Sequence, residues 1–120
     1  MTAVENIDIG PSSLVAEGQR VTVEVKDQVL ALVRVDGALF AIDDHCPHRE
    51  GHLGQGDLKG HHLYCPLHAW CFDVRNGNAF FPKGATIACF DVSEIEGRIV
   101  VNPLPNNRPA RARIVIPSLE

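Results

Sequence analysis

Short apolar segments separated by turn residues constrain the fold of this chain most. Residues 20–25 (RVTVEV) alternate between polar and apolar side chains, and residues 29–35 (VLALVRV) lead into Asp36-Gly37, a dipeptide typical of tight hairpin turns. The segment ALFAI (38–42) follows directly. Alternation with a period of two places successive side chains on opposite faces of a sheet, so residues 20–25 predict a strand. The turn at Asp36-Gly37 predicts that the segments on either side of it pair as antiparallel strands.

The same pattern continues along the chain. Turns are predicted at Lys59-Gly60 and at Glu96-Gly97, the second of them between CFDVSEI (89–95) and RIVV (98–101). No segment shows a convincing amphipathic helical periodicity. Since the chain has only 120 residues, we predict one all-β domain over residues 1–101, an antiparallel β sandwich or barrel.

Residues 102–120 differ in composition and are predicted to form a C-terminal extension. The stretch NPLPNNRPARAR is rich in Pro, Asn and Arg, which favours a flexible tail. The segment RIVIP (113–117) is an alternative edge strand, because three consecutive β-branched residues are unusual in a disordered tail.

The charge, the apolar runs and the cysteines of the chain limit the partners and the compartment that we expect. A net charge of −4 argues against a nucleic-acid partner. The apolar runs are far shorter than a membrane span, and the N-terminus lacks the pattern of a secretory signal, so we predict a cytoplasmic protein with no membrane partner. In a reducing compartment, the four cysteines are more often metal ligands than a disulfide framework.

Two matched clusters in the stretch CPHREGHLGQGDLKGHHLYCPLH predict a metal site. Cys46 and His48 form the first cluster, Cys65 and His68 form the second, and each cluster is predicted on a loop that follows a strand. Cysteine and histidine are ligands of soft and borderline metals, and the proline after each cysteine restricts the backbone that directs them. Buried cysteines and surface histidines without a metal would explain one such pair better than two.

A zinc site with two cysteines and two histidines uses the same residue types. Zinc fingers usually separate their paired cysteines by about two to four residues and their paired histidines by about three to five. Here each pair combines one cysteine with one histidine. The spacing therefore disfavours zinc without excluding it.

The arrangement Cys46-x-His48, sixteen residues, then Cys65-x-x-His68 resembles the Rieske iron–sulfur motif, and the flanking CPLHAWCFDVRNG resembles it as well. The resemblance covers about residues 5–101. It implies a Rieske-type β fold with two cluster-binding loops at one end and one 2Fe–2S cluster. Cys46 and Cys65 would bind one iron, and His48 and His68 would bind the iron that takes the electron.

Within the Rieske proteins, the chain resembles the low-potential ferredoxins. The respiratory and photosynthetic members have two further cysteines joined as a disulfide, at positions that correspond here to Gly51 and Leu67. They also have Ser and Tyr hydroxyls near the cluster, where Trp70 and Phe72 stand here. Since hydrogen bonds to the cluster sulfurs stabilise the reduced state, their loss predicts a potential near the low end of the range, about −150 mV.

The two remaining cysteines, Cys71 and Cys89, are predicted to be small buried hydrophobes. The segment FFPKG (80–84) resembles the proline loop that covers the cluster in this family. Three residues are candidates to shield the cluster from water, with plain core packing as the alternative: Trp70, Phe81 and Pro82.

Further titratable residues lie near the two clusters in the sequence. The motif gives no ligand role to four additional histidines, of which only the first is a candidate for contact with a ligand: His45, His52, His61 and His62. Four acidic residues are predicted to be solvated loop charges, which could also steer a basic partner: Asp43, Asp44, Glu50 and Asp57.

The resemblance implies an electron carrier and not an enzyme. A chain of this size has little room for a second active site, and it lacks histidine after Gly97 for a mononuclear iron site. The protein would pass single electrons from an NAD(P)H-dependent flavin reductase to the terminal oxygenase of an aromatic-ring dioxygenase system. The alternatives are a relative of the nitrite reductase small subunit and a zinc-stabilised interaction module.

Overall fold

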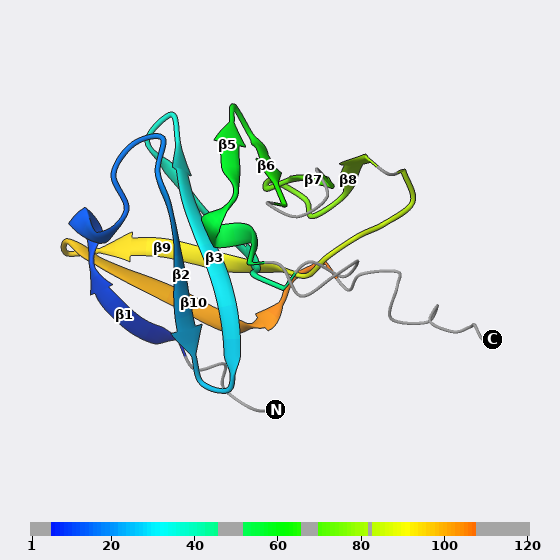
Figure 1. The fold of residues 1–120 in the computed structure, drawn as a ribbon. Helices are drawn as coiled ribbons and strands as arrows, with labels where there is room; N and C mark the ends of the chain where they lie inside the picture. The colour runs from blue at the N-terminus through cyan, green and yellow to red at the C-terminus, as the bar shows by residue number, and fades with distance from the viewer. Residues whose placement is uncertain (1–5, 46–51, 66–69, 82, 108–120) are drawn as a thin grey trace.

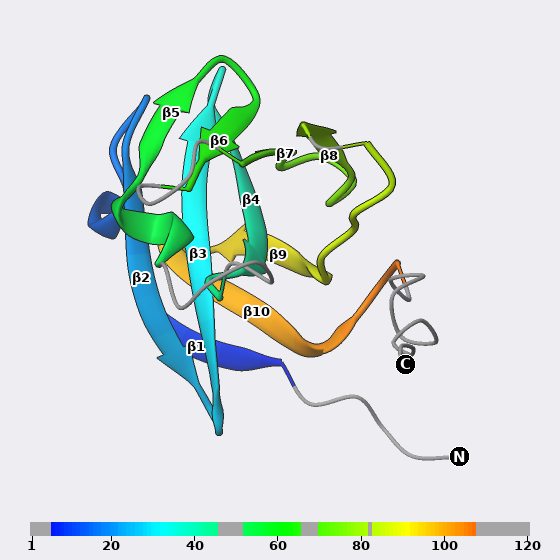
Figure 2. The same ribbon diagram turned by 45° about the vertical axis from the view of Figure 1, so that its right-hand side comes forward.

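The computed structural model describes residues 6–45, 52–65, 70–81 and 83–107. Within these residues the protein is built from two antiparallel sheets, with two short 3-10 helices (Figures 1 and 2). The large sheet has the order β1-β10-β9-β4-β3-β2. Its strands are β1 (Ile7–Pro11), β2 (Arg20–Val25), β3 (Gln28–Val35), β4 (Ala38–Asp43), β9 (Cys89–Ile95) and β10 (Arg98–Pro105). The prediction of an antiparallel all-β fold is confirmed.

The hairpin between β3 and β4 forms as the sequence predicts. Val35 pairs with Ala38, which leaves Asp36 and Gly37 as the two turn residues. Their φ angles are 54° and 83°, the positive values that a type I′ turn requires. Asp tolerates this conformation and Gly adopts it without a steric cost, so this dipeptide fixes the register of the two strands.

The small sheet follows β4 in the chain and has the order β5-β6-β7-β8. Its strands are β5 (Asp57–Lys59), β6 (His62–Tyr64), β7 (Cys71–Asp73) and β8 (Ala79–Phe81). Leu58, Leu63, Phe72 and Ala79 lie opposite one another across the four strands. This row is the apolar face of the small sheet, and it packs against the large sheet.

Two hydrophobic clusters use opposite faces of β3. Ala31 and Val33 contribute to the cluster between the two sheets, which includes Leu63 and Phe72. Leu30 and Leu32 contribute to a second cluster, inside the curve of the large sheet. Because the middle of β3 is buried on both faces, residues 29–33 (VLALV) form an apolar run and do not alternate.

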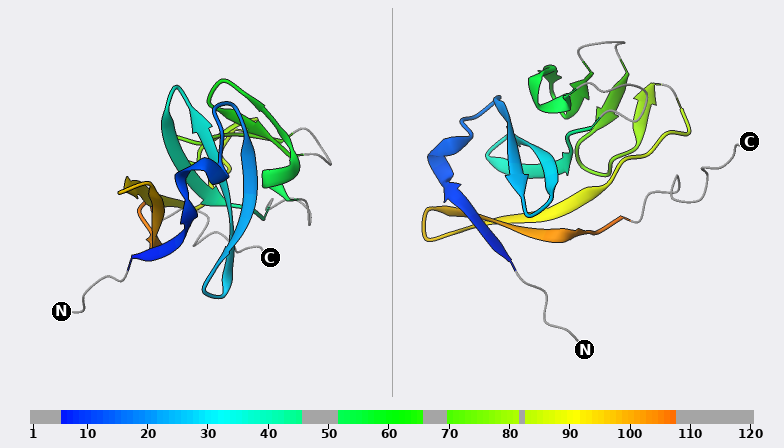
Figure 3. Two further views of the ribbon diagram at one scale, coloured as in Figure 1. Left: turned by 90° about the vertical axis from the view of Figure 1, so that its left-hand side faces the viewer. Right: turned by 60° about the horizontal axis from the view of Figure 1, so that its bottom comes forward.

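The large sheet curls toward a barrel (Figure 3). Strands β1 and β2 are its two edges, yet they approach each other across the curl. No helix of the described residues is long and apolar enough to cross a membrane.

Strand β10 continues through Asn102 to Pro105, so the predicted boundary after residue 101 falls within this strand. The chain then stays close to β9. The backbone amide of Asn106 donates a hydrogen bond to the Cys89 carbonyl (2.8 Å), and the backbone amide of Cys89 donates one to Asn107 Oδ1 (3.0 Å). Residues 108–120, with the predicted alternative edge strand, lie outside the described residues.

Candidate metal centre

Of the four predicted ligands, Cys65 lies within the described residues. Its residue is 3% exposed and belongs to the hydrophobic cluster between the two sheets. Cys46, His48 and His68 lie outside the described residues. The structure therefore shows where the two predicted cluster loops begin and end, and it shows the surroundings of one ligand.

The ends of the first loop are held together by backbone contacts. Residues 46–51 lie between His45 and His52, which form an isolated antiparallel β-bridge. Just outside this bridge, the Leu53 amide donates a hydrogen bond to the Asp44 carbonyl at 2.7 Å. The residues on either side of the loop are thus held together at the end of β4.

The residues on either side of the second loop, residues 66–69, are also held together by backbone contacts. The Cys65 amide donates a hydrogen bond to the Trp70 carbonyl at 2.7 Å, and Tyr64 pairs with Cys71 one step further along the ladder. The loop is therefore a short connection between β6 and β7. This ladder fixes the backbone of Cys65 directly before the loop.

Both loops leave the same part of the core. Leu53, the first residue of the helix η2 (Leu53–Gln55), belongs to the same hydrophobic cluster as Cys65, Leu63 and Phe72. Trp70 is partly buried and packs against this cluster, with its ring 6.3 Å from that of Phe72. The described residues beside the two predicted loops thus share one hydrophobic cluster.

The donor types fit a cluster that is bound by cysteine and histidine. Cys65 is shielded by apolar neighbours and has a backbone fixed by the β6–β7 ladder, surroundings that would suit a thiolate ligand of a 2Fe–2S cluster. The same types also fit zinc. No group of three or more His, Cys, Asp or Glu within the described residues is placed to hold a metal ion, and three predicted ligands lie outside that part of the chain.

Asp44 is the one charged residue among the buried residues of the described chain, at 1% exposure. Its Oδ1 accepts hydrogen bonds from Thr22 Oγ1 (2.9 Å) and from the Gly54 amide (2.7 Å). Its Oδ2 lies 2.6 Å from His52 Nδ1. The prediction of a solvated charge is wrong for Asp44, because residues distant in the sequence cover the carboxyl group and bind it.

The two other described cysteines are buried as predicted, Cys71 at 1% exposure and Cys89 at 4%. Burial raises the pKa of the Cys71 thiol, and a hydrogen bond from Tyr64 partly opposes this effect. Burial, with a smaller contribution from the Asp73 carboxylate, raises the pKa of Cys89 to about 11. Both thiols are therefore protonated at neutral pH, as expected of packing residues.

The histidines of the small sheet pack against aromatic rings. His61 meets Phe40 edge-on at 5.7 Å, and His62 lies 4.9 Å from the exposed ring of Phe80. Both histidines are half-buried. The Phe81 side chain and Pro82, two of the predicted shielding residues, are outside the described part of the chain.

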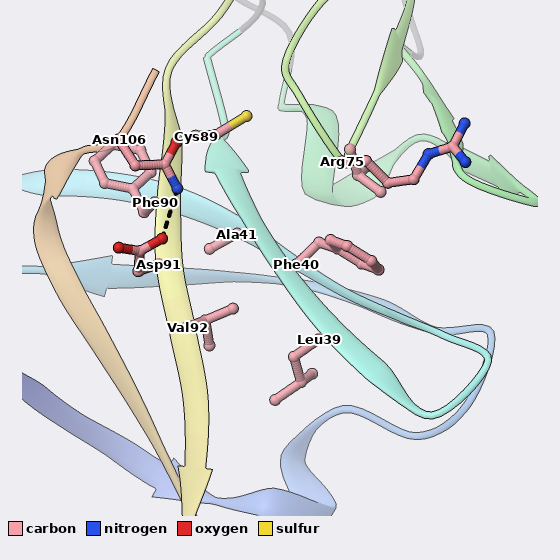
Figure 4. Close-up of a pocket in the computed structure, with 10 residues that line it drawn as sticks. Leu39, Phe40, Ala41, Arg75, Cys89, Phe90, Asp91, Val92 and Asn106 are labelled. Carbon is pink, nitrogen blue, oxygen red and sulfur yellow. Dashed lines mark hydrogen bonds between the residues drawn. The ribbon is translucent and has the colours of Figure 1, made fainter. Parts of the chain in front are cut away.

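A groove of about 220 Å³ lies against β4 and β9 (Figure 4). Its polar groups are already paired: Asn106 Nδ2 donates to Asp91 Oδ1 at 2.7 Å, and the Arg75 guanidinium points away toward Asp73, 2.8 Å from its carboxylate. Apolar side chains line most of the remainder, including Leu39 and Val92. The groove offers no convergent polar groups for a ligand.

Comparison with known proteins finds a matching family and a similar protein. Residues 5–91 match the family model described as Rieske [2Fe-2S] domain. The chain is 36% identical over 88 residues to the ferredoxin component of the naphthalene 1,2-dioxygenase system of Pseudomonas aeruginosa, covering 72% of this chain and 84% of that protein.

Two solved structures have a similar fold. A chain in the complex of reduced oxygenase and oxidized ferredoxin of carbazole 1,9a-dioxygenase matches with a TM-score of 0.75 and 28% identity, over 84% of this chain and 95% of that chain. A putative NADH-dependent nitrite reductase small subunit from Mycobacterium tuberculosis matches with a TM-score of 0.79 and 18% identity, over 88% of this chain and 100% of that chain. At that identity the second likeness shows the fold alone.

Proposed function

Because this chain belongs to the Rieske [2Fe-2S] domain family, we propose that it carries single electrons from an NAD(P)H-dependent flavin reductase to the terminal oxygenase of an aromatic-ring dioxygenase system. The observation that carries the proposal is that Leu53 and Cys65, which lie beside the two predicted cluster loops in the sequence, belong to one hydrophobic cluster. The relative from Pseudomonas aeruginosa is the ferredoxin component of such a system.

We assign the ligands by the motif. Cys46 and Cys65 would bind one iron of a single 2Fe–2S cluster, and His48 and His68 would bind the other. When bound, such a cluster accepts and releases one electron. The burial of Cys65 supports this division, because a thiolate ligand within the core would bind the iron farther from the solvent.

The protein's own part in the transfer is to hold the ligands and to exclude water. The hydrogen bond from Cys65 to Trp70 fixes the start of the second loop, and the bridge between His45 and His52 fixes both ends of the first. The apolar cluster behind Cys65 contains Leu63 and Phe72, both 0% exposed. A rigid and dry support of this kind keeps structural change small when the charge of the site changes.

The proposed partners meet the protein transiently. The solved complex of a relative contains an oxygenase with its ferredoxin, which supports a direct encounter with an oxygenase here. Electron-transfer encounters of this kind bury small interfaces, often below about 1,200 Å². The reductase and a cytoplasmic location are part of the same proposal, as is a C-terminal extension that follows Asn107.

The nitrite reductase small subunit is the second candidate, because the fold is shared. Members of that group commonly lack the cluster ligands, and this chain has all four. The presence of the ligands therefore favours the ferredoxin function. A zinc-stabilised interaction module keeps the same residues but transfers no electrons.

An anaerobic electron-transfer assay tests the proposal. The purified protein should be red-brown, should bleach when NADH and a ring-hydroxylating dioxygenase reductase are added, and should regain its colour when an oxidised oxygenase component follows. A colourless zinc protein would contradict the proposal. So would a coloured protein that exchanges electrons only with a nitrite reductase.

A further inference from the structure

Asp44 connects the two ends of the first loop. It lies two residues before Cys46, at the loop's entry, and it contacts three consecutive residues at the loop's exit. His52 Nδ1 lies 2.6 Å from its Oδ2, the Leu53 amide donates to its carbonyl at 2.7 Å, and the Gly54 amide donates to its Oδ1 at 2.7 Å.

The same residue attaches the loop to the large sheet. Thr22 Oγ1 of β2 donates a hydrogen bond to Asp44 Oδ1 at 2.9 Å, and the Asp44 amide donates to the Val29 carbonyl of β3 at 3.1 Å. A carboxyl group with 1% exposure costs free energy unless such bonds satisfy it. The buried carboxyl group of Asp44 therefore has its full set of hydrogen bonds only when both ends of the first loop are packed against the large sheet.

The packing around this carboxyl group requires a glycine. A Cβ atom at Gly54 would lie 2.2 Å from Thr22 Oγ1 and 2.8 Å from Asp44 Oδ1, closer than real atoms approach. The backbone of η2 can therefore reach the carboxyl group only because residue 54 has no side chain. His52 contributes differently: its side chain is 57% exposed, but its Nδ1 points at a buried oxygen.

From these contacts we propose that Asp44 is a positioning residue for the cluster. Together with His52, it closes the base of the first loop and so holds Cys46 and His48 at a fixed place relative to Cys65. The inference rests on the proposed function. A loop with fixed ends loses less conformational entropy when its ligands bind, so a clamped loop retains its cluster longer than a free one.

The rate of cluster loss tests the inference. Wild type, Asp44→Asn and His52→Ala are loaded with their clusters, and an iron chelator is added anaerobically while the visible absorbance is followed. Each variant should lose its cluster about tenfold faster than wild type, the ratio that corresponds to one lost hydrogen bond with a charged group. Asp57→Asn is the matched control, because it removes the same charge from an exposed residue.

Electron paramagnetic resonance of the reduced proteins separates positioning from a general structural role. A displaced loop should change the resonance lines of the cluster in both variants, whereas a merely structural role lowers the melting temperature of the metal-free protein and leaves these lines as they are. If Asp44→Asn does not fold, His52→Ala decides, since most of its side chain is in solvent.

The inference is overturned if the variants keep the wild-type resonance lines, or if they lose their clusters within twofold of the control rate. Either result leaves the proposed function standing. A wild-type protein that binds no iron would overturn the proposed function and this inference together.

Discussion

Replacing each described cysteine by serine separates ligand chemistry from packing. Cys65, Cys71 and Cys89 are equally hidden, at 3%, 1% and 4% exposure, so packing alone predicts similar results for all three. The ligand assignment predicts one severe result and two mild ones.

The magnitude of the packing effect follows from the surroundings of each thiol. A buried hydroxyl without a partner costs about 1–3 kcal/mol. In Cys71→Ser the new hydroxyl can keep the hydrogen bond with the Tyr64 hydroxyl, so its cost should lie at the low end of this range. Domains of this size are stable by about 5–15 kcal/mol, so each variant should stay folded.

The assay combines circular dichroism, iron content and the visible spectrum. Cys71→Ser and Cys89→Ser should retain the iron content of the wild type, whereas Cys65→Ser should fold with little iron and no red-brown colour, because a ligand is lost. Equal iron loss in all three variants, or full iron in Cys65→Ser, would refute the assignment.

Three other predictions address charge and titration. Burial raises the pKa of Cys89 from an ordinary 9.0 to about 11, so at pH 8 iodoacetamide should modify it about a hundredfold more slowly than in the urea-unfolded chain; equal rates by mass spectrometry would contradict this. His68→Cys should lower the midpoint potential in a redox titration, because a thiolate adds negative charge to the cluster; an unchanged or higher midpoint would contradict the ligand role. The hydrogen bond from Arg34 lowers the pKa of the Glu94 carboxyl below 4.5, so the stabilisation by this pair is present above pH 4.5 and is lost as the pH falls through the folded-state pKa. Glu94→Gln should therefore make the urea midpoint less sensitive to acid than in the wild type. Identical pH profiles of the urea midpoint would argue against this role of Glu94.

Local features of the fold could be predicted from the sequence. Alternation in residues 20–25 and the Asp36-Gly37 dipeptide predict β2 and the hairpin between β3 and β4, since both depend on neighbouring residues alone. The pairing of β1 with β10 could not be predicted, because it joins segments about ninety residues apart and neither sequence specifies the other.

The candidate site shows the same limit. The spacing of cysteine and histidine predicts the two loops and the family, because the ligands of a Rieske cluster follow this spacing in the sequence. The burial of Asp44 depends on Thr22, which lies 22 residues earlier, and on Gly54, which lies ten residues later. A pattern of neighbouring residues does not contain that information.

In the proposed function, a 2Fe–2S cluster held by Cys46, His48, Cys65 and His68 gives this protein its one-electron chemistry. Analysis of anaerobically purified protein for iron, zinc and acid-labile sulfide tests it most directly. We predict two iron atoms and two sulfides per chain, with negligible zinc. Stoichiometric zinc without iron or labile sulfide would contradict the claim.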